Sequence, residues 1–330
     1  MLTFVLRRIG VMALTMLILT GIVFYLTNLE PNLRTLALSD GNMRMTDAEI
    51  QQWLERNGYA RPFFERYLEW LGGIVTGDWG YSTRFRTPVL EIISQRLAAT
   101  GALMFFVMLV MVPSALLVGV LAGMREGSAL DRSLSGFSIA STATPEYVSG
   151  IIFTVIFASW FRELGETYAW FPEWFHLNGS AASANGRAGL NLTFYNFTLP
   201  VITMAIYGMG YVARMTRASM AEVMTSQYIR TARLKGVKFR TIVIRHALRN
   251  ALIAPFTVIM LQFPWLLTGV VVVEAMFNYR GFGLALVEAA ENNDIDLLMA
   301  CSLVSVAVVL TTQLISDIGY AYLNPRIRVQ

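Results

Sequence analysis

Residues 214–250 read RMTRASMAEVMTSQYIRTARLKGVKFRTIVIRHALRN and separate two apolar, charge-free stretches, 192–213 and 250–273. A helix rises about 1.5 Å per residue, so roughly 20 apolar residues cross the hydrocarbon core of a membrane. Both flanking stretches are long enough. The joining segment carries nine Lys or Arg residues and one acid, Glu222, and short loops with such an excess of basic residues stay on the cytoplasmic side. The pattern predicts two membrane spans joined by a cytoplasmic segment.

The rest of the chain repeats this alternation. Of its 330 residues 55% are hydrophobic and only 15% are charged, and the mean hydropathy is +0.52, which argues against a water-soluble globular protein. We therefore expect an all-α integral membrane protein with six transmembrane helices. Only the third of its charge-free stretches is interrupted, by Glu146. The six stretches are 9–29, 97–124, 133–161, 192–213, 250–273 and 297–316.

The basic residues predict the orientation. With the N-terminus inside, three segments that carry basic residues are cytoplasmic, and both chain ends lie on that side. Arg7 and Arg8 precede the first apolar run, as in a signal peptide, but Asn28-Leu29-Glu30-Pro31 after it offers no small-residue cleavage site, so we expect a retained anchor. Besides 214–250, the cytoplasmic residues that support this orientation are Arg125, Arg132, Arg326 and Arg328, against Arg162, Arg187 and Arg280 on the other side.

The long outer loop, residues 30–96, is expected to contain two helices. Thr46 and Glu49 have the spacing of a capping box that begins the first, and Gly58 can end it. Pro62 suits the first turn of the second, which we expect to stop at Gly72-Gly73. Aromatic rings favour the membrane interface, so the loop is predicted to lie flat on the outer surface through its tryptophans, Trp53, Trp70 and Trp79, with a specific docking surface as the alternative.

The interrupted third span points to a pathway. A carboxylate in mid-membrane costs about 2.5–3.5 kcal/mol on insertion scales unless it faces water or a partner, so Glu146 is predicted to line a translocation path, with pairing to a neighbouring subunit or protonation as the alternatives. The adjacent Pro145 loosens the helix there. Glu274, just beyond the fifth stretch, lies either on the path or at the interface. The predicted path residues are Pro145, Glu146, Tyr147 and Glu274.

No pattern of catalytic or metal-binding residues stands out. One cysteine, Cys301, and two histidines, His176 and His246, make up neither a disulfide, nor a Cys/His metal set, nor a nucleophile pair. The sequence has no G-x-x-x-x-G-K-[ST] loop to cradle phosphates. A proton-driven secondary transporter, the competing class, is expected to bury several ionisable groups, and only Glu146 is a clear candidate.

Within the cytoplasmic segment we expect a short helix from Tyr228 to Lys235, capped at Ser226-Gln227 and ended by a left-handed Gly236. Its charges alone favour contact with lipid headgroups. Its order of residues is more specific. YIRTARLKG at 228–236 followed by RHALRNAL at 245–252 closely resembles the cytoplasmic loop of the oligopeptide and dipeptide permease family of ABC importers, in which a coupling helix inserts into a cleft of the ATPase subunit. The residues that carry this likeness are Tyr228, Arg230, Thr231, Ala232, Arg233, Lys235 and Gly236.

The resemblance covers nearly the whole chain and is closest to the first, B-type, of the two permeases that such importers pair. Further matching motifs are Gly77-Asp78-Trp79-Gly80, Glu274-Ala275-Met276-Phe277 and Pro325-Arg326-Ile327. The resemblance implies a type I ABC importer permease fold in a bacterial inner membrane. It also implies a segment with the first span (1–29), a periplasmic loop (30–96) and a core permease domain (97–330) that contains the coupling loop 214–250.

The resemblance also implies the partners. They are a second homologous permease subunit, two ATPase subunits that bind ATP and Mg, a periplasmic solute-binding protein and membrane lipid, without nucleic acid and without a cofactor in this chain. The implied cargo is di- and oligopeptides. Nickel chelates and oligosaccharides are the alternatives, because relatives of this permease type carry those.

Overall fold

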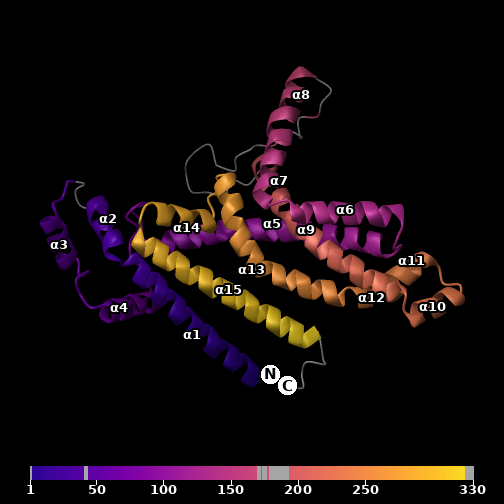
Figure 1. Cartoon of the computed structure of the whole chain (residues 1–330), viewed down its shortest axis with the longest axis horizontal. Coiled ribbons are helices and arrows are strands. Elements are labelled where there is room, and N and C mark those ends of the chain that lie inside the picture. The colour runs from indigo at the N-terminus through magenta and orange to yellow at the C-terminus, as the bar shows by residue number, and fades with distance from the viewer. Residues whose placement is uncertain (1, 41–43, 169–171, 173–176, 178–192, 324–330) are drawn as a thin grey trace. The chain divides into compact units, whose positions relative to one another are not determined.

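The computed structural model describes residues 2–40, 44–168, 172, 177 and 193–323, and the regular elements in these ranges are helices (Figure 1). The basic tail residues Arg326 and Arg328 lie outside the described residues. In chain order the helices are α1 (Leu2–Thr27), α2 (Glu30–Asp40), α3 (Asp47–Arg56), α4 (Phe63–Thr76), α5 (Val89–Gly123), α6 (Ala129–Ala143), α7 (Glu146–Phe153), the π-helix η1 (Thr154–Trp160), α8 (Phe161–Thr167), α9 (Phe194–Met224), α10 (Gln227–Leu234), α11 (Phe239–Thr241), the π-helix η3 (Ile242–Ala247), α12 (Leu248–Ala251), α13 (Ile253–Met276), α14 (Phe282–Glu291) and α15 (Ile295–Leu323).

Four helical stretches of the described chain are long and apolar enough to cross a membrane. They are Leu6–Thr27, Val89–Gly123, Glu146–Thr167 and Ile295–Ile318. A fifth crossing is made if the pair Phe239–Ala251 and Ile253–Phe263, bent by 52°, is counted as one span. Residues 194–213 of the expected stretch 192–213 instead belong to α9, which continues as one helix to Met224, well into the basic segment. The protein is therefore a helical, multi-pass protein with four or five recognisable spans in its described part.

The third expected span is broken. α6 ends at Ala143, Thr144 and Pro145 are extended with ψ of 118° and 145°, and α7 begins at Glu146. Proline disfavours the helical conformation of the residue before it and lacks the N–H that a helix interior needs. The prediction of one helix over 133–161 with Glu146 at its middle is therefore wrong. Glu146 is the first residue of a helix, where its charge suits the positive end of the helix dipole.

The chain divides into two compact units, of which the first comprises residues 1–99 and 280–311. α3 begins with the expected capping box: the Thr46 N–H donates to the Glu49 carboxylate (2.7 Å) and the Glu49 N–H donates to Thr46 Oγ1 (3.4 Å). α4 runs through the Gly72-Gly73 pair and ends at Gly77, whose φ is +93°, so the expected end was placed too early.

The three tryptophans of residues 30–96 are partly buried against apolar clusters of the first unit. Trp53 and Trp70 lie against a buried cluster made by Phe24 of α1 with residues of α2 and α15. Trp79 lies against a second buried cluster that α5, α14 and α15 form. Each of the three therefore has apolar partners within the unit, and their contact with the membrane stays a prediction.

The second unit comprises residues 100–279 and 312–330 and is organised around α9. α9 packs against α6, α7 and α13, which lie alongside it in Figure 1. Small residues allow α5 to approach it closely: a Cβ on Gly123 would lie 2.5 Å from the carbonyl oxygen of Arg217. Close approach through small side chains is how membrane helices gain packing energy in the absence of a hydrophobic driving force between them.

Candidate functional site

The predicted coupling helix is α10, which follows α9 after a two-residue turn. Its apolar anchor is Ile229, which is fully buried against Met220, Met224 and residues of η3 and α12. Ser226 occupies the cap position in an extended conformation, but its hydroxyl donates to the Val223 carbonyl (2.6 Å) instead of capping α10. A helix of eight residues has little stability alone, so the burial of Ile229 is what holds α10 in place.

The end of α10 agrees with the prediction. Gly236 has φ of +72°. The Gly236 N–H donates to the Arg233 carbonyl (3.0 Å) and the Val237 N–H donates to the Ala232 carbonyl (3.2 Å), which together form a Schellman motif. Ala232 and Val237 both pack on the cluster around Ile229, as the hydrophobic contact of that motif requires.

Gly236 is therefore expected to tolerate asparagine better than valine. A Cβ at this position meets no atom within 4 Å, so the cost of a substitution comes from the positive φ, which a β-branched residue resists most. We expect Gly236→Val to lower the thermal stability of the purified protein and its ATP-driven uptake, with Gly236→Asn close to the wild type. Equal loss in the two variants would show that the left-handed conformation is not what this position requires.

The outer face of α10 is polar except at one point. The side chains of Tyr228, Arg230, Thr231, Arg233 and Lys235 are exposed, and Ala232 is partly buried. Leu234, which sequence reasoning did not single out, is 82% exposed between two cations. A large apolar side chain so exposed on a charged helix suits insertion into a partner's cleft. The signal in the sequence is its position, 140° around the helix from the buried Ile229.

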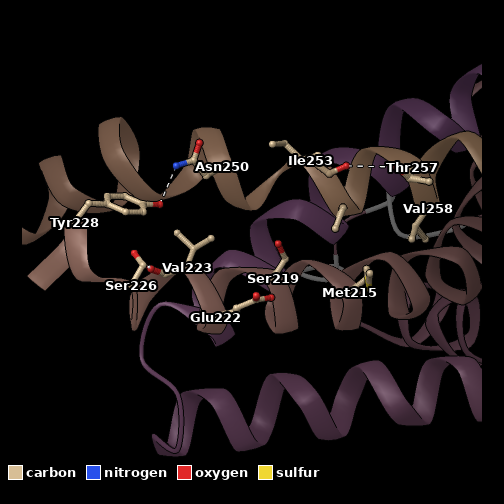
Figure 2. Close-up of a pocket in the computed structure, with 11 residues that line it drawn as sticks. Met215, Ser219, Glu222, Val223, Ser226, Tyr228, Asn250, Ile253, Thr257 and Val258 are labelled. Atoms are coloured by element: carbon tan, nitrogen blue, oxygen red, sulfur yellow. Dashed lines mark hydrogen bonds between the residues drawn. The ribbon is translucent and has the colours of Figure 1, made fainter. Parts of the chain in front are cut away.

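A groove with a volume of about 590 Å³ lies behind α10, between the C-terminal half of α9 and residues 250–258 (Figure 2). Tyr228 closes one end, where its hydroxyl accepts a hydrogen bond from the Asn250 side chain (2.9 Å). Glu222, the sole acid of the basic segment, lies on its α9 wall. The other lining residues are Met215, Ser219, Val223, Ser226, Ile253, Ala254, Thr257 and Val258.

Ser219 forms a hydrogen bond with the backbone at the break before α13. Pro255 has no N–H, so the carbonyl of Ala251, four residues earlier, lacks its helical donor. Ser219 Oγ of α9 donates to that carbonyl (2.8 Å). At the second proline of α13, Pro264, the freed carbonyl of Met260 likewise accepts from Ser316 Oγ of α15 (3.0 Å). Neighbouring hydroxyls commonly satisfy backbone groups that proline frees in membrane helices.

Ser219→Ala is expected to destabilise the protein by about 1–2 kcal/mol, because a backbone acceptor in the interior loses its donor. The midpoint of thermal unfolding in detergent measures this. Ser226→Ala is the matched control, since the Val223 carbonyl keeps a bond from the Ser226 N–H (3.0 Å) after the hydroxyl is lost. If the two variants are equally stable, the bond to Ala251 contributes nothing.

An ion pair joins α9 to α6, ten residues before α10 begins. Arg217 donates from Nε to Asp131 Oδ1 (2.9 Å) and from a terminal nitrogen to Oδ2 (2.8 Å), and the Asp131 side chain is 4% exposed. The Gly127 N–H (2.8 Å) and the Ser135 hydroxyl (3.1 Å) also donate to this carboxylate. The hydrogen bonds from Arg217 hold the pKa of the Asp131 carboxyl well below its usual range. Sequence reasoning missed this pair, whose members are 86 residues apart.

The predicted path residues lie towards the other end of α9. Pro145 and Tyr147 are exposed and Glu146 is partly buried at the start of α7, whereas Glu274 is fully buried and accepts a hydrogen bond from Thr100 of α5. α7 meets α9 and the end of α13 at Gly150, where a side chain would collide with Met276 and contact Thr203. From Thr203 to the last residue of α9, Met224, the helix is unbroken, which is about 30 Å of rigid rod. The described residues contain no group of three His, Cys, Asp or Glu side chains placed to hold a metal ion.

Comparison with known proteins identifies the family. Residues 115–329 match the family described as binding-protein-dependent transport system inner membrane component, and residues 1–104 match the N-terminal part described for the same systems. The chain belongs to this family. It is an ABC transporter permease of the inner membrane that crosses the bilayer several times.

Relatives match over most or all of the chain. The oligopeptide transport system permease protein AppB of Bacillus subtilis (strain 168) is 33% identical over 285 residues, 86% of both chains. The di/tripeptide transport system permease protein DppB of Pseudomonas aeruginosa (strain UCBPP-PA14) is 30% identical over all of both chains. The dipeptide transport system permease protein DppB of Escherichia coli (strain K12) is 29% identical over 99% of both chains.

Proposed function

We propose that this chain is one of two permease subunits of an ATP-driven importer of di- and oligopeptides. The observation that carries the proposal is the geometry of α10: one side chain buried in the chain's own core, a glycine-ended stop, and an outer face of cations around an exposed leucine. Such a helix is fixed to its own subunit on one side and presents the other to a partner. The names of the relatives supply the peptide cargo.

In this proposal α10 docks on one of two ATPase subunits, which bind ATP and Mg, and the chain has no ATP-hydrolysing site of its own. A displacement of α10 acts directly on α9, because only two residues separate the helices. α9 is continuous and is tied to α6 by the Asp131–Arg217 pair, so it transmits the displacement over about 30 Å to the region of α7 and the end of α13.

The topology that goes with this proposal has six spans, both termini in the cytoplasm and residues 30–96 on the periplasmic side, where a solute-binding protein delivers the peptide. The excess of basic residues in 214–250 supports this orientation. Domain assignments follow: the first span in 1–29, the periplasmic loop in 30–96 and the permease core in 97–330. The cargo passes between this subunit and its homologous partner, past Pro145, Glu146 and Tyr147 of the α6–α7 break, with Glu274 buried behind the path.

Reconstitution tests the proposal. The chain is reconstituted in proteoliposomes with a partner permease and ATPases, the binding protein is added, and uptake of labelled peptides is measured. We expect uptake only when ATP is on the side of the membrane that carries the ATPases and the binding protein is on the opposite side. Uptake driven by a proton gradient without ATP would overturn the proposal in favour of a secondary transporter.

Glu146→Gln is expected to reduce uptake of cationic peptides more than uptake of neutral ones, at equal assembly of the permease pair. A negative charge beside the path favours positively charged cargo through Coulomb attraction, and glutamine removes it with little change in shape. Uptake of peptide series that differ only in charge measures the effect. An equal change for all peptides would show that Glu146 does not select cargo by charge and serves only as the first residue of α7.

A further inference from the structure

α4 has three distinct faces. Phe63, Tyr67 and Trp70 pack on Phe24 of α1 and its neighbours. About a third of a turn away, Phe64, Leu68 and Val75 are 75%, 64% and 86% exposed. Their spacing of four and seven residues places them on a single stripe. The third face is polar and carries Glu65, Glu69 and Thr76.

The contacts of Tyr67 fix where α4 crosses α1. Its hydroxyl donates to the Leu17 carbonyl (2.9 Å) and lies 2.8 Å from Thr20 Oγ1. The membrane-crossing part of α1 ends at Thr27, ten residues and about 15 Å beyond Leu17. The rings of Phe63, Tyr67 and Trp70 meet Phe24, which is three residues and about 5 Å before that end, so α4 lies beside the last turns of the apolar span rather than above it.

The exposed stripe continues the exposed surface of α1. Tyr25 of α1 is 58% exposed and meets Phe63 edge to face, with ring centroids 6.0 Å apart. Phe63 in turn meets Phe64 of the stripe at 5.3 Å. Ile22 and Ile18, one and two turns away from Tyr25 on α1, are also about half exposed. An apolar surface that continues a membrane span at the same depth is in contact with the same lipid acyl chains.

The charged groups lie where this arrangement requires. Glu69 on the polar face forms an ion pair with Arg61 (2.6 Å), and both side chains are largely exposed. Arg66 turns inward, where its guanidinium lies over the rings of Phe24 and Tyr59. Segregation of exposed charges from an exposed apolar stripe is typical of helices that lie in a membrane interface.

We propose that the stripe of Phe64, Leu68 and Val75 inserts into the acyl-chain region of the bilayer, so that α4 anchors the loop 30–96 to lipid. The tryptophans expected to do this are occupied inside the unit. The contact with acyl chains does not depend on the peptide proposal. Only the choice of the outer leaflet rests on the topology proposed above.

Spin labelling of the assembled transporter in bilayer nanodiscs tests this. Single cysteines are introduced by Leu68→Cys and Val75→Cys in a Cys301→Ala background, with Glu65→Cys on the polar face as the matched control. Collision with oxygen, which concentrates in hydrocarbon, is compared with collision with a water-soluble nickel chelate. We expect the oxygen-to-chelate ratio to be severalfold higher at positions 68 and 75 than at 65.

A chelate-accessible label at 68 would overturn the proposal, because the stripe would then face water. Labels at 68 and 75 that neither reagent reaches would also overturn it and assign the stripe to a protein partner, the second permease or the binding protein. Peptide uptake by the same variants is measured separately. A lipid-exposed stripe in a transporter that takes up no peptide would contradict the proposed function alone.

Discussion

Asp131→Asn is expected to lower the stability of the protein by about 2 kcal/mol, within the range for loss of hydrogen bonds to a charged group, because Arg217 stays partly exposed and within 3.6 Å of Glu126. The carboxylate is almost completely enclosed and accepts four hydrogen bonds, two of them from Arg217. Asparagine has one acceptor oxygen in place of two and no charge, so the guanidinium loses its bidentate partner. The midpoint of thermal unfolding in detergent measures the change.

The exposed neighbour Arg132 provides the control. Arg132→Gln removes one charge from the same helix turn and is expected to change stability little, as exposed charges usually do. A double-mutant cycle with Arg217→Gln isolates the pair: the double variant is expected to be less destabilised than the sum of the single variants. Additive losses would show that each residue is important for a separate reason.

The pH dependence of this effect has a definite sign. Because Arg217 lowers the pKa of the Asp131 carboxyl in the folded protein, the pair contributes its stability above the pKa of an unfolded aspartate, about 4, and loses it as the pH falls further. The difference between wild type and Asp131→Asn is therefore expected to be constant between pH 6 and 8, to a rough approximation, and to shrink only in strong acid. A difference that changes near neutral pH would point to another titrating group.

Simultaneous replacement of Arg230 and Arg233 by glutamate is expected to abolish coupled transport. Both side chains are exposed on α10, and neither forms an ion pair within the described part of the chain. The fold should survive, because the anchor Ile229 and the Gly236 stop are untouched. Loss of central contact residues typically costs about 2 kcal/mol or more, which is roughly a thirtyfold loss of affinity for the partner.

Retention of the ATPase subunits by the purified permease pair and ATP-driven uptake are the measurements. The matched control is the double reversal of Lys238 and Arg240, which changes the net charge equally just beyond α10. If α10 only contacts lipid headgroups, the two double variants behave alike. If it docks on an ATPase, only the reversal on α10 releases the subunits or separates hydrolysis from uptake. Normal uptake in the α10 variant would contradict docking.

Short-range signals predicted the local elements well. The capping box at Thr46, the start of α10 near Ser226 and its left-handed end at Gly236 each depend on a few neighbouring residues, and each was predicted. The apolar stretch of α1 was equally clear from its length. Capping signals depend on residues three to five apart and the apolar count depends on composition, so the sequence alone predicted the membrane class and the short helix; its coupling role came from the family resemblance.

Only the tertiary structure decided which polar groups meet and which apolar faces remain uncovered. Arg217 meets Asp131 across 86 residues, and Ser219 meets the carbonyl that Pro255 frees. Both contacts depend on how α9 packs against other helices. Trp70 turned inward, whereas Phe64 and Leu68 on the same helix are exposed. Composition cannot separate these outcomes, because a buried helix face and a lipid-facing one are equally apolar. Which neighbouring helix covers a side chain depends on packing between distant segments, and residue type alone does not encode it.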